Sequence, residues 1–122
     1  MKKFLLPEGD YLTVIRQTEV LPWGSMPHRA LGLTLELLTP PREGCWLTRW
    51  VFFDAWAPQL ARERFSRLGG RISQVAEIDA EAASLVGGRL RVRLVRDAQG
   101  REKPLILGFA GREVCEQLTL GR

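Results

Sequence analysis

The fold is decided by GCWLTRWVFFD, the stretch at residues 44–54. Its aromatic and β-branched side chains are typical of a strand, and Gly44 and Asp54 mark its two ends. Successive side chains of a strand point to opposite faces. One face therefore carries Leu47, Arg49, Val51 and Phe53, and the other carries Trp46, Thr48, Trp50 and Phe52.

Both faces of this strand are rich in large apolar groups, which leaves two interpretations. Either the strand lies in an ordinary aromatic core, or one face carries rings meant for a flat partner. A single small domain rarely covers both faces of a strand, so we favour the second interpretation. The rings of Trp46, Trp50 and Phe52 would then form a stacking platform for nucleic-acid bases.

Composition places the chain among ordinary globular proteins of one domain. It has 122 residues, of which 45% are hydrophobic and 26% charged. The opening MKKFLLP has too short an apolar run for a signal peptide, and no stretch approaches the roughly 20 apolar residues of a membrane span. We therefore expect a cytoplasmic protein with no membrane partner.

The chain offers little for metal or redox chemistry. Cys45 and Cys115 have no local metal-ligand spacing, and in a cytoplasmic protein two such cysteines are expected to be free thiols. The one histidine is His28. Carboxylates are scattered, and no glycine-rich phosphate loop or nucleophile motif is present. We expect no metal, no cofactor, no small-molecule substrate and no enzymatic activity.

The charge favours an anionic partner. The net charge is +4 and the isoelectric point is about 9.7. Arginine supplies most of the 18 basic residues, and its planar group stacks on rings and binds phosphate with two hydrogen bonds. A preference for arginine also arises in GC-rich or heat-adapted genomes, so composition alone does not decide the partner.

Strand and helix patterns follow one another in a simple order. Alternation predicts strands at 11–19, 29–39, 44–54, 89–96 and 103–110, with a helix from Pro58 to the glycine pair at 69–70. A second short helix is expected to begin at Asp79 and to stop at 87–88. Residues 20–27 read as a loop, in which Trp23 either folds back as a hydrophobic plug or contacts a ligand.

The strand at 89–96 has the second informative pattern. Leu90, Val92 and Leu94 face one way and three arginines face the other. A row of like charges is unfavourable unless something anionic lies across it, although a solvated outer face is the alternative. The candidate contacts to a nucleic-acid backbone are Arg16, Arg29, Arg49, Arg89, Arg91, Arg93, Arg96, Arg101 and Lys103.

The order strand, strand, strand, helix, strand, strand is that of the OB-fold, a five-stranded Greek-key barrel. Its ligand face lies over strands two and three, flanked by the first hairpin loop and by the loop between strands four and five. Those places hold aromatic and basic residues here, which is the combination that a single-strand groove needs. The candidate stacking residues are Trp23, Trp46, Trp50 and Phe52.

Several short motifs also resemble a family. They are PEGDY at 7–11, RALGLTLELL at 29–38, Gly44 before the aromatic strand, RLG at 67–69, LVGGRL at 85–90 and GF at 108–109. In order and spacing they resemble an uncharacterised phage family of single-stranded-DNA-binding-like proteins from replication and recombination modules. The resemblance covers residues 5–110 and implies an OB-fold that binds single-stranded DNA.

Two features depart from that family. The sequence ends in LTLGR, without the acidic tail by which many such proteins recruit partners, and the expected polar last strand contains LIL at 105–107. These apolar groups, with those at 118–120, predict a homodimer or higher oligomer. An RNA-binding OB module and an OB-type protein-interaction domain are the alternatives to DNA binding.

Overall fold

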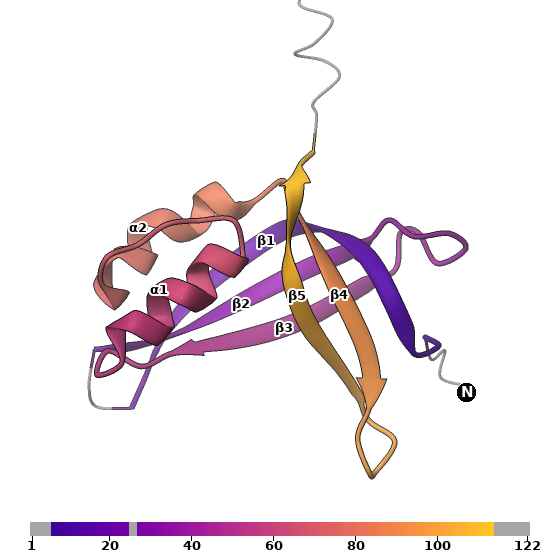
Figure 1. Ribbon diagram of the computed structural model, residues 1–122, viewed down its shortest axis with the longest axis horizontal. Coiled ribbons are helices and arrows are strands. Elements are labelled where there is room, and N and C mark those ends of the chain that lie inside the picture. Colours follow the sequence, from indigo (N-terminus) through magenta and orange to yellow (C-terminus); the bar gives the residue numbers. More distant parts are fainter. Residues whose placement is uncertain (1–5, 25–26, 114–122) are drawn as a thin grey trace, which may run out of the picture.

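The computed structural model describes residues 6–24 and 27–113. Its five strands form one antiparallel sheet in the order β3-β2-β1-β4-β5 (Figure 1). The strands are β1 (Gly9–Trp23), β2 (His28–Leu37), β3 (Trp46–Phe53), β4 (Gly88–Arg96) and β5 (Glu102–Arg112). Between β3 and β4 lie α1 (Pro58–Arg67), the 3-10 turn η1 (Val75–Glu77), α2 (Ile78–Glu81) and the 3-10 turn η2 (Ala82–Leu85).

The sheet curls into a half-barrel, with the helices covering one end of its concave side (Figure 1). The long strand β1 allows this curl, because it pairs with β4 through residues 9–14 and with β2 through residues 13–23. Its register shifts between Ile15 and Gln17, and such a bulge bends a strand. Within the described residues, β3 and β5 are not paired to each other.

The strand β1 continues to Trp23, beyond the predicted end of the strand at residue 19. Pro22 stays within it, opposite Arg29 of β2. Proline is tolerated on a strand with a free edge, and this half of β1 has β2 as its neighbour but not β4. The predicted loop at 20–27 is therefore shorter than expected.

The core lies between the concave face of the sheet and the helices. The alternation predicted for β2 and β4 is confirmed, because the predicted apolar rows are buried. The helix α1 contributes the predicted stripe and ends at Gly69 and Gly70, whose N–H groups bond to Ser66 O and Phe65 O. Buried side chains include Leu31, Leu33, Leu35, Leu37, Ala61, Phe65, Leu68, Leu90, Val92 and Leu94.

The second helical segment begins earlier than predicted. The first 3-10 turn starts at Val75, and Asp79 lies inside α2 instead of capping it. The reason is an apolar stripe at helical spacing, in which Val75, Ile78, Ala82 and Leu85 are all buried. The Asp79 carboxylate is used elsewhere, in an ion pair with β2.

No helix in the described ranges is long and apolar enough to cross a membrane. Cys45 is a free thiol. Cys115 and the apolar residues at 118–120 lie outside the described residues.

Candidate nucleic-acid interface

The predicted faces of β3 are confirmed. Leu47 and Phe53 are buried in the core, whereas Trp46 is 57% exposed and Phe52 is 50% exposed on the opposite face. Trp50, between them, is half-buried. The concave side of the half-barrel is filled by the core, so the second row of β3 must lie on the outer face. We call the rings of Trp46, Trp50 and Phe52 the aromatic row.

The Trp50 ring lies over Gly32 of the neighbouring strand. A methyl group at Gly32 would lie 2.8–3.0 Å from three atoms of the six-membered ring. The space above this glycine is therefore filled by the chain's own tryptophan. Beside the ring is a hollow of about 420 Å³, lined by Gln17, Thr18, Glu19, Gly32, Thr34, Thr48 and Trp50.

Trp23 is fixed at one end of the aromatic row. Its indole stacks on His28 with ring centres 4.5 Å apart, and its Nε1–H donates to Arg29 O at 2.9 Å. The Phe52 ring lies nearly perpendicular to this indole, with ring centres 5.9 Å apart. Trp23 therefore folds back against the sheet, as one of its two interpretations expected, and it also extends the aromatic row.

His28 packs against Trp23 at this end of the aromatic row. The ring is 7% exposed, and its Nδ1 accepts a hydrogen bond from the Ala55 N–H at 2.9 Å. One carboxylate oxygen of Asp54 lies 3.3 Å from the same Nδ1.

Trp56 is a candidate that the sequence did not single out. It is 65% exposed, and its ring meets His28 edge-on with centres 6.0 Å apart. It lies in the short connection between β3 and α1, outside any alternating pattern. The available signal was a tryptophan in a short connection between predicted elements, the same kind of position that marked Trp23.

Most of the predicted basic residues already have partners within the chain. Arg93 binds Asp10 with two hydrogen bonds, at 2.8 and 3.2 Å. Arg89 donates to Arg112 O. The anionic group expected across the arginines of β4 is thus supplied in part by β1. The other arginine–carboxylate pairs among the candidates are Arg16 with Glu36 and Glu113, Arg29 with Asp79, Arg96 with Glu102, and Arg101 with Asp97.

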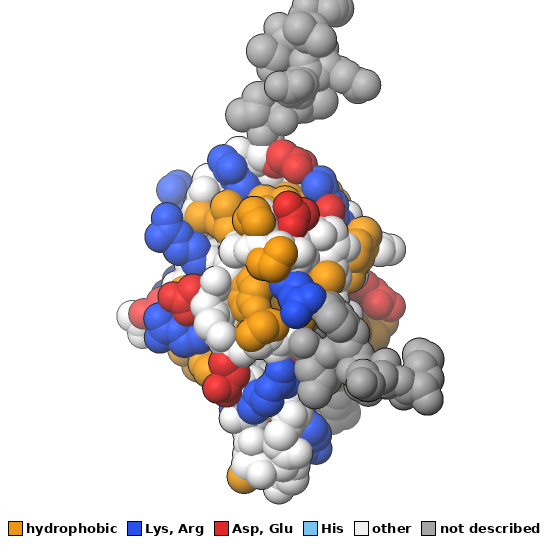
Figure 2. All heavy atoms as spheres, turned by 90° about the vertical axis from the view of Figure 1, so that its right-hand side faces the viewer, with side chains coloured by type: hydrophobic (Ala, Val, Ile, Leu, Met, Phe, Trp, Pro, Cys, Tyr) orange, Lys and Arg blue, Asp and Glu red, His pale blue; other side chains and the backbone are white. Residues whose placement is uncertain are grey.

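These pairs perturb the carboxyl groups. Hydrogen bonds from Arg93 and Arg29 hold the pKa values of Asp10 and Asp79, respectively, below the usual 3.8. Backbone N–H groups of the β4–β5 turn, together with the Arg101 side chain, lower the pKa of Asp97. The pairing of charges is also visible on one face of the molecule, where basic and acidic side chains lie beside one another around a central hydrophobic area (Figure 2).

Arg91 and Lys103 differ from the other candidates. Among the described residues neither side chain has a hydrogen bond or an ion pair, and both are exposed. Arg91 lies on the outward row of β4, opposite Leu12 of β1. Lys103 lies near the β4–β5 turn, opposite Val95. Within residues 6–24 and 27–113, a contact between either cation and an anion would therefore break no internal pair.

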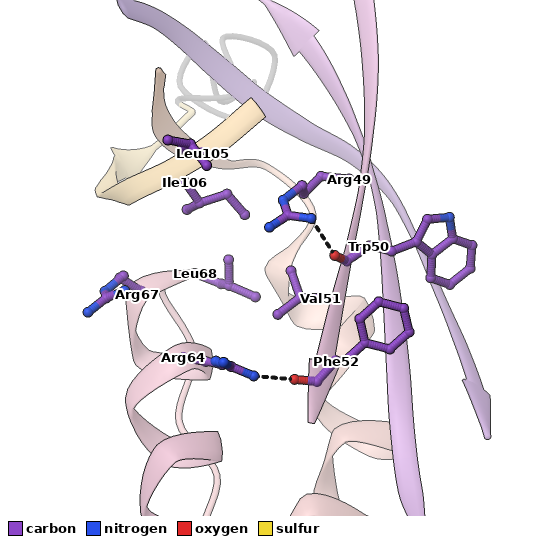
Figure 3. A pocket seen from close by; sticks show the side chains of 9 residues that line it. All are labelled: Arg49, Trp50, Val51, Phe52, Arg64, Arg67, Leu68, Leu105 and Ile106. Carbon is purple, nitrogen blue, oxygen red and sulfur yellow. Dashed lines mark hydrogen bonds between the residues drawn. The ribbon is translucent and has the colours of Figure 1, made fainter. Parts of the chain in front are cut away.

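Arg49 lies on the inward row of β3, at a groove between β3, α1 and β5 (Figure 3). Its guanidinium donates to Trp50 O at 2.9 Å, and its Nε is buried without a partner. Arg64 donates to Phe52 O at 2.8 Å, and Arg67 also lines the groove. Both Arg64 and Arg67 are exposed on α1, on the side of the helix that borders this groove.

No protein-family model and no curated protein matches this chain. The resemblance to a phage family therefore stays a prediction made from the sequence motifs.

Proposed function

We propose that this protein binds single-stranded DNA without sequence preference, on the outer face of β3. The observation that carries the proposal is the exposure of Trp46 and Phe52 on a strand face that no described element covers. Large rings in water are unfavourable unless they meet a partner. Every base has a flat face that stacks on such rings, whatever the sequence.

The architecture supports an OB-type domain as the finer description of the half-barrel. The strand order β3-β2-β1-β4-β5, with the helices between β3 and β4, is the order that an OB-fold uses. The ligand face of that fold lies over its second and third strands. The aromatic row lies on the third strand, and Trp23 extends it toward the β1–β2 hairpin.

The charges support weak, salt-sensitive backbone contacts. The net charge is +4, and Arg91 and Lys103 have no ion pair in the described part of the chain. Five further candidates are already paired with carboxylates, so their charge is partly compensated before any phosphate contact: Arg16, Arg29, Arg93, Arg96 and Arg101. Stacking on the aromatic row therefore supplies most of the affinity in this proposal.

The proposed biological role is protection of single strands in replication or recombination, as the sequence resemblance implies. One OB-type domain covers about 4–16 nucleotides, so coverage of longer strands requires self-association or cooperative binding. Leu107 and Phe109 are partly exposed on β5 and are candidates for such a contact. Light scattering of the free protein measures the oligomeric state directly.

The test is a titration with oligo-dT followed by tryptophan quenching. Trp46→Ala and Phe52→Ala should each weaken binding by about 1–3 kcal/mol, the range for losing one stacked base. Leu60→Ala is the control, because Leu60 is an exposed apolar residue on α1, away from the aromatic row.

Competition then separates the alternatives. Oligo-rU that displaces oligo-dT at equal concentration would make the protein a general single-strand or RNA binder. Absence of quenching by oligo-dT, oligo-rU and duplex DNA would leave a protein-interaction domain and would refute nucleic-acid binding.

A further inference from the structure

A second surface lies on the other side of the β3 edge from the aromatic row. It is a groove of about 300 Å³ between β3, α1 and β5 (Figure 3). In the close-up, the side chains of Trp50 and Phe52 point away from the groove, so these residues border it with their backbone. The groove lies where β3 and β5 come near each other without pairing.

The chemistry of the groove is apolar in the middle and cationic at its edges. Val51, Leu68, Leu105 and Ile106 supply the apolar part, from β3, α1 and β5. Among the described residues, the charged side chains that line it are all arginines, from β3 and α1, and none is acidic. The charged set is Arg49, Arg64 and Arg67.

The guanidinium groups have donors left over. Arg49 and Arg64 each donate to one carbonyl of β3, at 2.9 and 2.8 Å, yet a guanidinium carries five N–H donors. The Nε of Arg49 is buried without a partner, which is unfavourable in the free protein. Arg67 and Glu63 are spaced to pair on α1, but no ion pair joins them in the described structure.

We propose that this groove binds a short segment of a partner protein in which acidic residues flank apolar ones. Charge complementarity decides the occupant, because three arginines border the groove and none of its described lining residues is a carboxylate. Carboxylates of the segment would take the free guanidinium donors. Apolar side chains of the segment would cover Val51 and Ile106, which are only partly buried in the free protein.

A nucleic acid fits this groove less well than a peptide does. Phosphates need water or polar groups around them, and the middle of the groove offers leucine, isoleucine and valine side chains. The rings that would stack bases point to the other face of β3. The volume is at the small end of ligand pockets, which suits a few side chains of an extended segment.

The probe is a fluorescein-labelled ten-residue peptide of alternating aspartate and leucine, followed by fluorescence polarisation with the full chain. Two peptides of equal length, one with lysine for aspartate and one with serine for leucine, test the charged and the apolar part separately. We expect binding of the first peptide alone. Equal binding of the serine peptide would overturn the apolar part, and no binding of the first peptide at millimolar concentration would overturn the proposal.

Substitutions on α1 locate the binding. Arg67→Glu should weaken the binding of the aspartate–leucine peptide by about tenfold, the loss expected for one charge-assisted hydrogen bond. The substitution breaks no internal hydrogen bond of the Arg67 side chain in the described structure. Arg62→Glu makes the same charge change on the same helix, outside the groove. The affinity of this variant for the aspartate–leucine peptide should stay within about twofold of the wild-type value. Equal losses in the two variants would refute the site.

A competition keeps this site separate from the proposed DNA-binding face. Saturating oligo-dT should leave the peptide bound, and amide shifts in labelled protein should report the peptide at 49–52, 64–68 and 105–106. Displacement of the peptide by oligo-dT would assign the groove to nucleic acid instead. Failure of oligo-dT to bind at all would refute the DNA proposal and leave the peptide site intact.

Discussion

The ring of Trp50 rests on Gly32, and a methyl group at that glycine would lie 2.8 Å from the nearest ring atom. The contact crosses from β3 to β2, since Gly32 is directly opposite Trp50 in the sheet. It holds the central ring of the aromatic row down on the sheet, between the more exposed rings of Trp46 and Phe52. The absence of a side chain at Gly32 therefore determines how closely the Trp50 ring approaches the sheet.

Gly32→Ala should lift the Trp50 ring while leaving the fold intact. The new methyl meets the outer atoms of a side chain that can turn, and alanine in a strand is intrinsically better than glycine by about 0.5–1 kcal/mol. We expect the indole N–H signal of Trp50 to shift and oligo-dT affinity to fall a few-fold, by less than the loss of one stacked base.

Gly108→Ala is the matched control for that change. Gly108 lies inside β5, and a methyl group there would meet no atom within 4 Å. The control should keep both the indole signal and the DNA affinity. Unchanged affinity in Gly32→Ala, despite a shifted indole signal, would show that bases do not use Trp50.

Arg91→Ala should reduce the salt dependence of DNA binding more than Arg93→Ala does. Arg91 has no partner among the described residues, whereas Arg93 donates two hydrogen bonds to the Asp10 carboxylate. One lost phosphate contact removes about 0.7 from the log–log slope for single strands. The slope is measured by titrating oligo-dT at several salt concentrations.

Asp10→Asn extends the same test. It releases Arg93, so the slope should become steeper and the affinity at low salt should rise. If Arg91→Ala leaves the slope unchanged, the outward row of β4 does not face the bound strand.

Asp79→Asn should destabilise the protein at neutral pH and have no effect in strong acid. Arg29 lowers the pKa of Asp79 below 3.8, so the ion pair stabilises the fold above the ordinary pKa. That stability is lost as the pH falls through the lowered pKa. Because the Asp79 side chain is 53% exposed, the effect should stay within the ~0–1 kcal/mol of surface pairs.

The measurement is the melting temperature of the wild type and the variant between pH 7 and pH 2. Glu81→Gln, an exposed change on the same helix, should follow the wild type at each pH. A gap between wild type and Asp79→Asn that persists at pH 2 would show that the effect does not arise from the carboxylate charge.

Gly69→Ala should destabilise the protein more than Gly100→Ala does. Both glycines have positive φ angles, +95° and +81°, and this conformation costs about 1–2 kcal/mol for a residue with a side chain. A methyl at Gly69 would also lie 2.3 Å from the Phe109 ring, whereas one at Gly100 meets nothing within 4 Å. Chemical denaturation measures both, and equal losses would mean that Phe109 moves aside freely.

The local pattern of the sequence predicted much of the fold. Alternation in LGLTLEL and in LRVRL assigned the buried rows of β2 and β4, because period-two burial follows from strand geometry alone. The same alternation correctly placed the aromatic row on the face of β3 opposite the buried side chains. Gly69 was identified as the end of α1 from its type and position.

Properties that depend on one strand's neighbours were not predictable in this way. The second helical segment was misplaced because a possible cap at Asp79 was given more weight than the apolar stripe that begins at Val75. The Arg93–Asp10 pair joins residues 83 positions apart, and the Arg29–Asp79 pair joins residues 50 apart. A sequence pattern contains no information about such contacts until the strand order is known.

The sequence by itself determined which side chains share a face of each strand and where the main helix ends, since these follow from backbone periodicity and from the conformational freedom of glycine. The tertiary structure decided which cations remain without a partner and which rings are supported. It also placed Arg64 and Arg67 of α1 beside Arg49 of β3 and the apolar residues of β5. The physical reason is that the bulge in β1 and the curl of the sheet bring these elements together, and side-chain periodicity within one strand does not specify that curl.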